Sequence, residues 1–168
     1  MNRFAHRLIL RRLVLALGMA APLAAVAYPS VAAAEEPQVN EGAVSKIKQF
    51  LEICESTPEL TEAGKKVASA GLVHKSKLDP NDSGQLNSDS LRFSFKKAHG
   101  AAKLYQVKIT RVVETKTTGV GFGKTAEKGK LFKYFVAKKD GVDGRPAPVQ
   151  IFFADGGGEP VLYDWGSF

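Results

Sequence analysis

Apolar side chains in the front part of the chain recur every three to four residues, which is the spacing of one helical face. This spacing predicts a helix over about residues 42–55. Thr57 is a suitable N-cap and Pro58 a suitable first residue for a second helix, which we expect to end at Gly71. The residues on the apolar face of the first helix are Val44, Ile47, Leu51 and Cys54.

Farther along the chain the apolar spacing changes to every second residue, which is typical of half-buried strands. Turn-forming residues separate the alternating segments, and Lys97–Gly100 is one such expected turn. Helices followed by a series of antiparallel strands predict an α+β fold, in which an N-terminal helix or helix pair packs on a curved antiparallel sheet of about five to six strands. The expected strands cover about residues 91–96, 105–115, 118–124, 130–138, 149–154 and 161–165.

The N-terminus has the three parts of a secretory signal peptide. Arginines without any acid precede an apolar run from Leu13 to Ala27, and small residues follow it. Ala32 and Ala34 provide the small side chains that signal peptidase requires, which predicts cleavage before Glu35. Ala25 and Ala27 provide an earlier cleavage site. We therefore expect a soluble periplasmic or secreted protein. The expected division is a signal peptide over residues 1–34, a flexible lead-in over 35–41 and a single α+β domain over 42–168.

Charge is segregated along the expected mature chain. Residues 35–62 carry a net charge of −5, residues 63–139 carry +12, and residues 140–168 carry −4. A basic middle can dock a polyanion such as lipid head groups or an acidic protein, but nucleic acid is excluded by the expected compartment. The simpler interpretation, which we favour, is a solvated sheet face whose lysines partly pair with the acidic first helix. The basic face is expected to include Lys96, Lys108 and Lys133.

Several tempting motifs do not meet their chemical requirements. Cys54 is the only cysteine, so an intramolecular disulfide is impossible, and its place on an apolar helix face predicts packing. The glycine-rich segment 119–125 has the wrong glycine spacing for a phosphate-binding loop, and no helix is expected after it. The segment from Asp79 imitates a calcium loop but has Ser90 where a bidentate acid is needed.

His74 and His99 are the two histidines outside the expected signal peptide, and they lack metal-ligand spacing. We expect His99 to lie in a solvent-exposed turn. Without a metal-binding, nucleophile-elbow or cofactor motif, the sequence predicts no catalytic residues, no metal and no cofactor. A dyad of either histidine with an aspartate remains an alternative.

The order of elements resembles the NTF2-like and cystatin-like superfolds. The resemblance is carried by Pro148–Phe153 followed by Val161–Trp165, which looks like the closing hairpin of small exported members, and by the ending Tyr163–Gly166. It rests on element order and implies a cone-shaped α+β domain. Because these folds include enzymes, transport factors and partner-binding modules, the resemblance implies no single function.

Aromatic residues on alternating strand positions can line a concave pocket or fill a core. The core is the more common role, and in a cone-shaped fold the same residues serve as both core and pocket lining. Together with the segregated charge and the lack of a catalytic motif, they make the leading hypothesis a non-catalytic periplasmic binding module for a protein or an amphipathic ligand. One alternative is a small hydrolase or isomerase with a His/Asp site in an aromatic pocket, and another is an inhibitor or immunity protein. The expected ligand-binding residues are Tyr105, Tyr134, Phe153, Tyr163 and Trp165.

Overall fold

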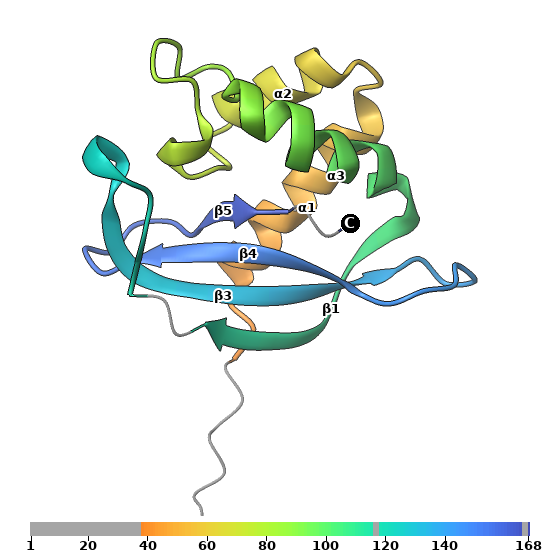
Figure 1. Cartoon of the computed structure of the whole chain (residues 1–168). Helices are drawn as coiled ribbons and strands as arrows, with labels where there is room; N and C mark the ends of the chain where they lie inside the picture. The colour runs from red at the N-terminus through yellow and green to blue at the C-terminus, as the bar shows by residue number, and fades with distance from the viewer. Residues whose placement is uncertain (1–37, 116–117, 166–167) are drawn as a thin grey trace, which may run out of the picture. The chain divides into compact units, whose positions relative to one another are not determined.

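Two α-helices open the described part of the chain, as the apolar spacing predicts (Figure 1). Helix α1 spans Glu41–Ser56 and begins at Asn40, whose side-chain oxygen accepts a hydrogen bond from the Ala43 N–H at 3.0 Å. Helix α2 spans Leu60–Ser69. The computed structural model describes residues 38–115, 118–165 and 168, so the expected signal peptide lies outside the described residues.

The start of α2 differs from the prediction. Thr57 is the C-cap of α1. Its N–H donates to the carbonyl oxygen of Ile53 at 3.0 Å, and its hydroxyl accepts a hydrogen bond from Lys66 Nζ at 3.1 Å. Glu59 is the N-cap instead, and its carboxylate accepts hydrogen bonds from the N–H groups of Thr61 and Glu62. These backbone donors hold the pKa of Glu59 below its ordinary value.

The expected strand over residues 91–96 is wrong. Residues Ser90–Phe95 form a π-helix that continues into helix α3, Lys96–Ala101, so the expected turn at Lys97–Gly100 is helical as well. Leu91 and Phe95 are four residues apart, a separation that places side chains on one face in a helix and also on one face in a strand. Phe93, which a strand would place on the same face, is 67% exposed.

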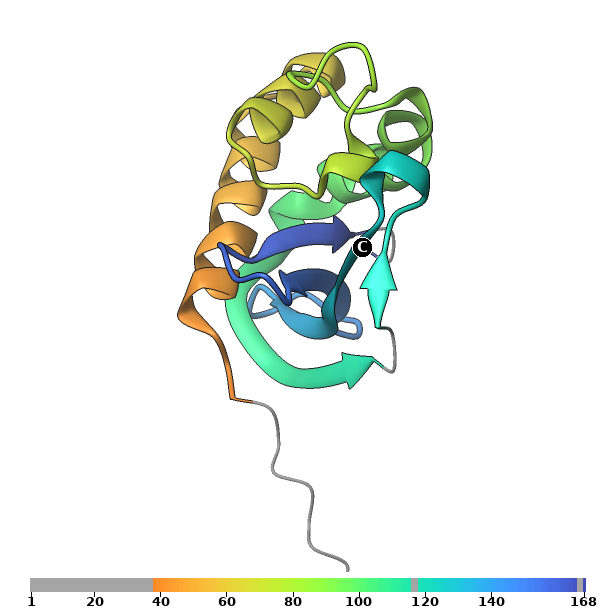
Figure 2. The same ribbon diagram turned by 90° about the vertical axis from the view of Figure 1, so that its left-hand side faces the viewer.

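The remaining strands form one antiparallel sheet in the order β1-β3-β4-β5, with β2 paired to the beginning of β3. The sheet is strongly curved, and the expected α+β class is confirmed (Figures 1 and 2). The expected segment 118–124 is a strand over two residues, followed by a 3₁₀ turn over Gly123–Thr125. The strands are β1 (Tyr105–Thr115), β2 (Gly119–Val120), β3 (Glu127–Lys138), β4 (Ala147–Ala154) and β5 (Val161–Asp164).

The main core lies between α1 and one face of the sheet. Helix α1 contacts both β1 and β5, and in Figure 2 it runs along the side of the sheet opposite to β2. The ring of Phe50 from α1 lies 5.4 Å from the ring of Trp165 and 6.0 Å from that of Phe95. All three side chains are completely buried. No helix in the described ranges is long and apolar enough to cross a membrane.

A smaller apolar cluster lies on the opposite face of the sheet. Its buried members are Val120, Leu131 and Phe152. Strand β3 has a glycine, Gly129, where a side chain would collide with this cluster: an added Cβ would lie 2.1 Å from the carbonyl oxygen of Phe153 and 2.7 Å from the Phe152 ring. The close approach of β4 to β3 therefore requires glycine at this position.

Replacing this glycine tests the close approach. We expect Gly129→Ala to lower the free energy of unfolding by about 2 kcal/mol, because the methyl group must displace the backbone of β4. Gly156→Ala is the matched control, since nothing lies within 4 Å of its added Cβ, and it should change stability by less than about 0.5 kcal/mol. Urea denaturation of both variants measures the difference, and equal stabilities would contradict the assigned strand contact.

Candidate functional site

The five aromatic residues expected to bind a ligand do not come together around one cavity. Tyr105, Tyr134 and Trp165 are buried in the main core, and half-buried Phe153 packs against the same core. Tyr163 packs instead against the smaller cluster on the other face of the sheet. Helix α1 fills the concave face through Phe50, so the structure places these rings in packing contacts.

The three lysines expected on a basic sheet face lie on different elements. Lys108 is exposed on β1 and Lys133 is half-buried on β3, whereas Lys96 is exposed on α3. The prediction that Lys96 lies on the sheet is therefore wrong, because residues 91–96 are helical. The structure does not bring the three lysines together on one sheet.

Cys54 and His99 have structural roles in the part of the chain that is described. Burial raises the pKa of the Cys54 thiol to about 12, which keeps it protonated and unreactive, in agreement with the predicted packing role. His99 was expected in an exposed turn, but it lies half-buried on α3, with Nε2 2.7 Å from the carbonyl oxygen of Thr57. It ties α3 to the residue that follows α1.

His74 lies in a short segment that extends the sheet beyond β5. Its backbone N–H donates to the carbonyl oxygen of Leu162 at 2.9 Å, and the Leu162 N–H donates to the carbonyl oxygen of Leu72 at 2.8 Å. These parallel contacts place the His74 ring against the smaller cluster, with ring centroids 5.3 Å from Phe152 and 5.7 Å from Tyr163. The histidine is only 3% exposed, so it is a buried polar group beside aromatic rings.

The contacts of the ring determine its tautomer. Nδ1 accepts a hydrogen bond from the backbone N–H of Ser76 at 3.2 Å and lies 2.8 Å from the Ser76 hydroxyl oxygen. A neutral imidazole whose Nδ1 accepts carries its proton on Nε2. Nε2 lies 3.5 Å from a carboxylate oxygen of Glu127, an ion-pair separation that does not meet hydrogen-bond geometry. Among the described residues, this buried nitrogen has no hydrogen-bond partner.

Burial is the main reason that His74 stays neutral. Burial lowers the pKa of His74, and this effect exceeds the opposing influence of the Glu127 carboxylate. Glu127 is held by Lys75, whose Nζ lies 3.0 Å from the same oxygen, and this contact is the main cause of its lowered pKa. At neutral pH the site therefore holds an uncharged imidazole with an N–H donor beside a Glu127–Lys75 ion pair.

A cavity of about 200 Å³ opens beside His74. Val73, Phe152 and Val161 make part of its lining apolar, while Lys75 and Glu127 add charge. Glu159 also lines it and is anchored to α1 by Lys46 at 2.6 Å. The cavity thus combines an apolar wall, the His74 ring and two carboxylates that are each paired with a lysine.

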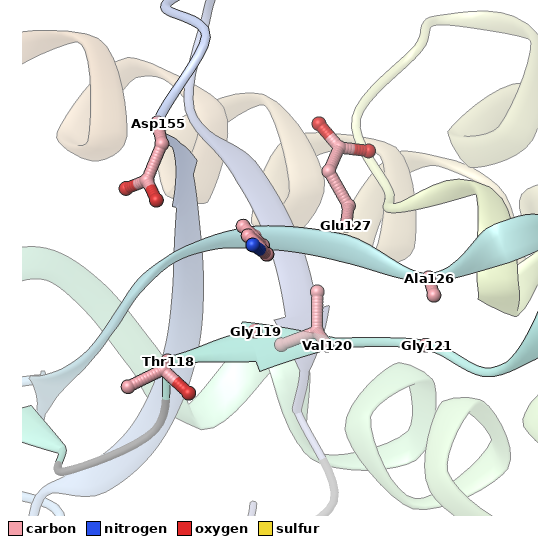
Figure 3. Close-up of a pocket in the computed structure, with 8 residues that line it drawn as sticks. Thr118, Gly119, Val120, Gly121, Ala126, Glu127 and Asp155 are labelled. Carbon is pink, nitrogen blue, oxygen red and sulfur yellow. The ribbon is translucent and has the colours of Figure 1, made fainter.

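A second, more open hollow of about 680 Å³ lies on the other side of Glu127, along the β2–β3 pair (Figure 3). Gly119 and Gly121 line it from β2 and the adjoining turn, and Asp155 lines it from the end of β4. Because Glu127 lines both spaces, it is the residue that the two share. In the described ranges no group of three or more histidine, cysteine or acidic residues is able to hold a metal ion.

The sequence identified His74 as one of two histidines but did not identify its carboxylate partner. Glu127 is distant along the chain, and the pairing depends on the sheet-edge contact of Leu72 with Leu162. The one signal in the sequence is the apolar pair Leu72–Val73 directly before the histidine, which is consistent with a buried ring.

The buried histidine predicts a specific pH dependence of stability. Its pKa is lowered in the folded state, so as the pH falls through the ordinary value of 6.5 the unfolded chain binds a proton that the folded chain does not. We expect the free energy of unfolding to fall between pH 7.5 and 5.5, and to fall less in His74→Phe. His99→Phe keeps His74 and should keep its contribution. Titration of the His74 ring by NMR measures the same shift directly, and a midpoint at or above 6.5 would contradict it.

Comparison with known proteins provides no independent assignment of this site. Neither a protein family, nor a curated protein, nor a solved structure gives a significant match to the chain. The resemblance to NTF2-like and cystatin-like folds therefore stays a prediction, and the function is argued from the residues of the site.

Proposed function

We propose that this protein is a non-catalytic binding module that acts in the periplasm and holds an amphipathic ligand in the cavity beside His74. The observation that carries the proposal is the His74 ring, which lines the cavity and whose buried Nε2–H has no hydrogen-bond partner among the described residues. A buried donor without an acceptor is destabilising, and a ligand that supplies an acceptor removes this cost.

The lining of the cavity supports a ligand with two chemically different parts. Phe152 and Val161 favour an apolar body, since burying apolar surface is the main source of affinity in such cavities. The His74 donor and the Lys75 ammonium favour an oxygen-rich, acidic head group, because the two carboxylates of the lining, Glu127 and Glu159, are each paired with a lysine. A short alkyl carboxylate combines both parts at a size that suits a cavity of about 200 Å³.

Binding of hexanoate tests the proposal. We expect saturable NMR shifts of the His74 ring and of Phe152 and Val161, because these residues line the cavity. Hexylamine, which has the same chain and a cationic head, should bind at least about tenfold more weakly. The His74 donor cannot bond to an ammonium group, and the two carboxylates in the lining, Glu127 and Glu159, are already paired with Lys75 and Lys46. His74→Phe should bind hexanoate at least about tenfold more weakly, which is the effect of losing one buried hydrogen bond to a charged group.

His99→Phe is the matched control and should bind hexanoate as the parent protein does. Two results would contradict the proposal: shifts that do not saturate, and equal binding by the parent protein and His74→Phe.

A hydrolase is the second candidate, and one observation favours it. The Ser76 hydroxyl, His74 and Glu127 form a row with separations of 2.8 Å and 3.5 Å, which are the residue types of an acyl-transfer triad. Against this, the Ser76 N–H also bonds to Nδ1, and Ser76 is not among the residues that line the cavity. A binding module therefore explains more of the observed geometry than a hydrolase does.

Ester hydrolysis separates the two candidates. If the protein is a binding module, p-nitrophenyl butyrate should be hydrolysed no faster with the protein than without it. A hydrolase would instead give turnover that Ser76→Ala abolishes, while Ser56→Ala, which changes an exposed serine at the end of α1, leaves the turnover intact. Such turnover would replace the proposal of a binding module.

A further inference from the structure

The tip of the hairpin formed by β2 and β3 carries the most exposed large apolar side chain among the described residues. Phe122 is 90% exposed, compared with 67% for Phe93 and 52% for Val39. The tip is the coiled segment at the upper left of Figure 1, at the edge of the sheet. It belongs to the glycine-rich segment 119–125, whose residues suit neither a phosphate-binding loop nor a buried strand.

The backbone of this tip is built to hold Phe122 outward. The Thr125 hydroxyl donates to the carbonyl oxygen of Phe122 at 2.8 Å and accepts from the Phe122 N–H at 3.2 Å. Gly121 has a φ of +77°, and an added Cβ there would lie 2.3 Å from the carbonyl oxygen of Thr125. This compact turn needs glycine at position 121, so the exposed ring stands on a defined loop.

The charge around the tip is positive. Residues 118–130 contain three lysines and a single acid, Glu127. That acid is engaged by Lys75, at a distance of 3.0 Å, and Lys75 therefore adds its own charge at the base of the hairpin. Lys124 adjoins the exposed ring in the turn itself, and Lys128 follows at the start of β3. An exposed aromatic side chain thus lies on a hairpin that is rich in lysine.

We propose that this hairpin tip is a peripheral contact site for an anionic lipid bilayer. An aromatic ring lowers its free energy at the boundary between head groups and acyl chains, and nearby lysines are attracted to anionic head groups. A bilayer accepts a convex apolar tip without a shaped pocket, whereas a protein partner must supply one. The inference is independent of the ligand proposed for the His74 cavity.

A tryptophan at the tip tests the contact directly. Phe122→Trp replaces an exposed ring by a fluorescent one, and the native Trp165 is fully buried and gives a constant background. We expect vesicles of phosphatidylcholine with phosphatidylglycerol to shift the emission to shorter wavelength, and vesicles of phosphatidylcholine alone to leave it unchanged. Phe93→Trp is the matched control, since it changes the other strongly exposed phenylalanine, and its emission should not shift.

Co-sedimentation with the same vesicles measures the contribution of each group. The whole chain is expressed, and all variants share the same N-terminus. Differences in vesicle binding then result from the substitutions at the hairpin tip. We expect Phe122→Ser to lower the partition coefficient about tenfold or more, and Lys124→Ala to lower it by several-fold, with the loss shrinking in high salt. Phe93→Ser should bind like the parent protein.

Three results would overturn the proposal. They are no sedimentation of the parent protein with anionic vesicles, binding that Phe122→Ser leaves unchanged, and an equal loss in Phe93→Ser. In the first case a protein partner, recovered by crosslinking at position 122 and lost in Phe122→Ser, would take the place of the bilayer.

Discussion

The packing of α1 onto the concave face of the sheet is the constraint on which the rest of this structure depends. A curved antiparallel sheet with one apolar face requires cover on that face. Phe50 supplies it at the centre, in contact with Trp165 and Phe95, and all three rings are fully buried. Because a helix occupies this face, most of the aromatic residues that were expected to line a pocket are core residues instead.

The consequence of a filled concave face is that the candidate site lies on the other side of the sheet. There the smaller cluster around Phe152 supports the His74 ring, and the segment Leu72–His74 pairs with Leu162 to extend the sheet edge. These contacts bury a neutral imidazole beside Glu127 without placing a formal charge in the interior, since Lys75 pairs with the carboxylate. The arrangement leaves a buried donor without a partner on a ring that lines a partly apolar cavity, which is a recognition feature.

One hairpin connects the two proposed activities. Glu127, at the start of β3, lines the cavity, and Phe122, at the tip of the same hairpin, is the exposed ring proposed to touch lipid. The contact between Gly129 and the carbonyl oxygen of Phe153 fixes the path of β3 just beyond Glu127. A ligand with an apolar body and an acidic head is chemically compatible with a membrane surface. The two proposals share the Glu127–Lys75 ion pair, but each depends on a different central residue, His74 or Phe122.

The sequence by itself determined α1, the long strands and the α+β class, because each of these elements repeats its own local burial pattern over several turns or residue pairs. The sequence interpretation of residues 91–96 was wrong, since Leu91 and Phe95 share a face at a separation of four in either structure. Tertiary packing, in which Phe95 contacts Phe50 and Trp165, accompanies the helix. The tertiary structure alone decided that α1 fills the concave face and that His74 meets Glu127. That meeting depends on backbone hydrogen bonds between segments distant along the chain, and such pairing leaves no periodic trace in the residues that take part.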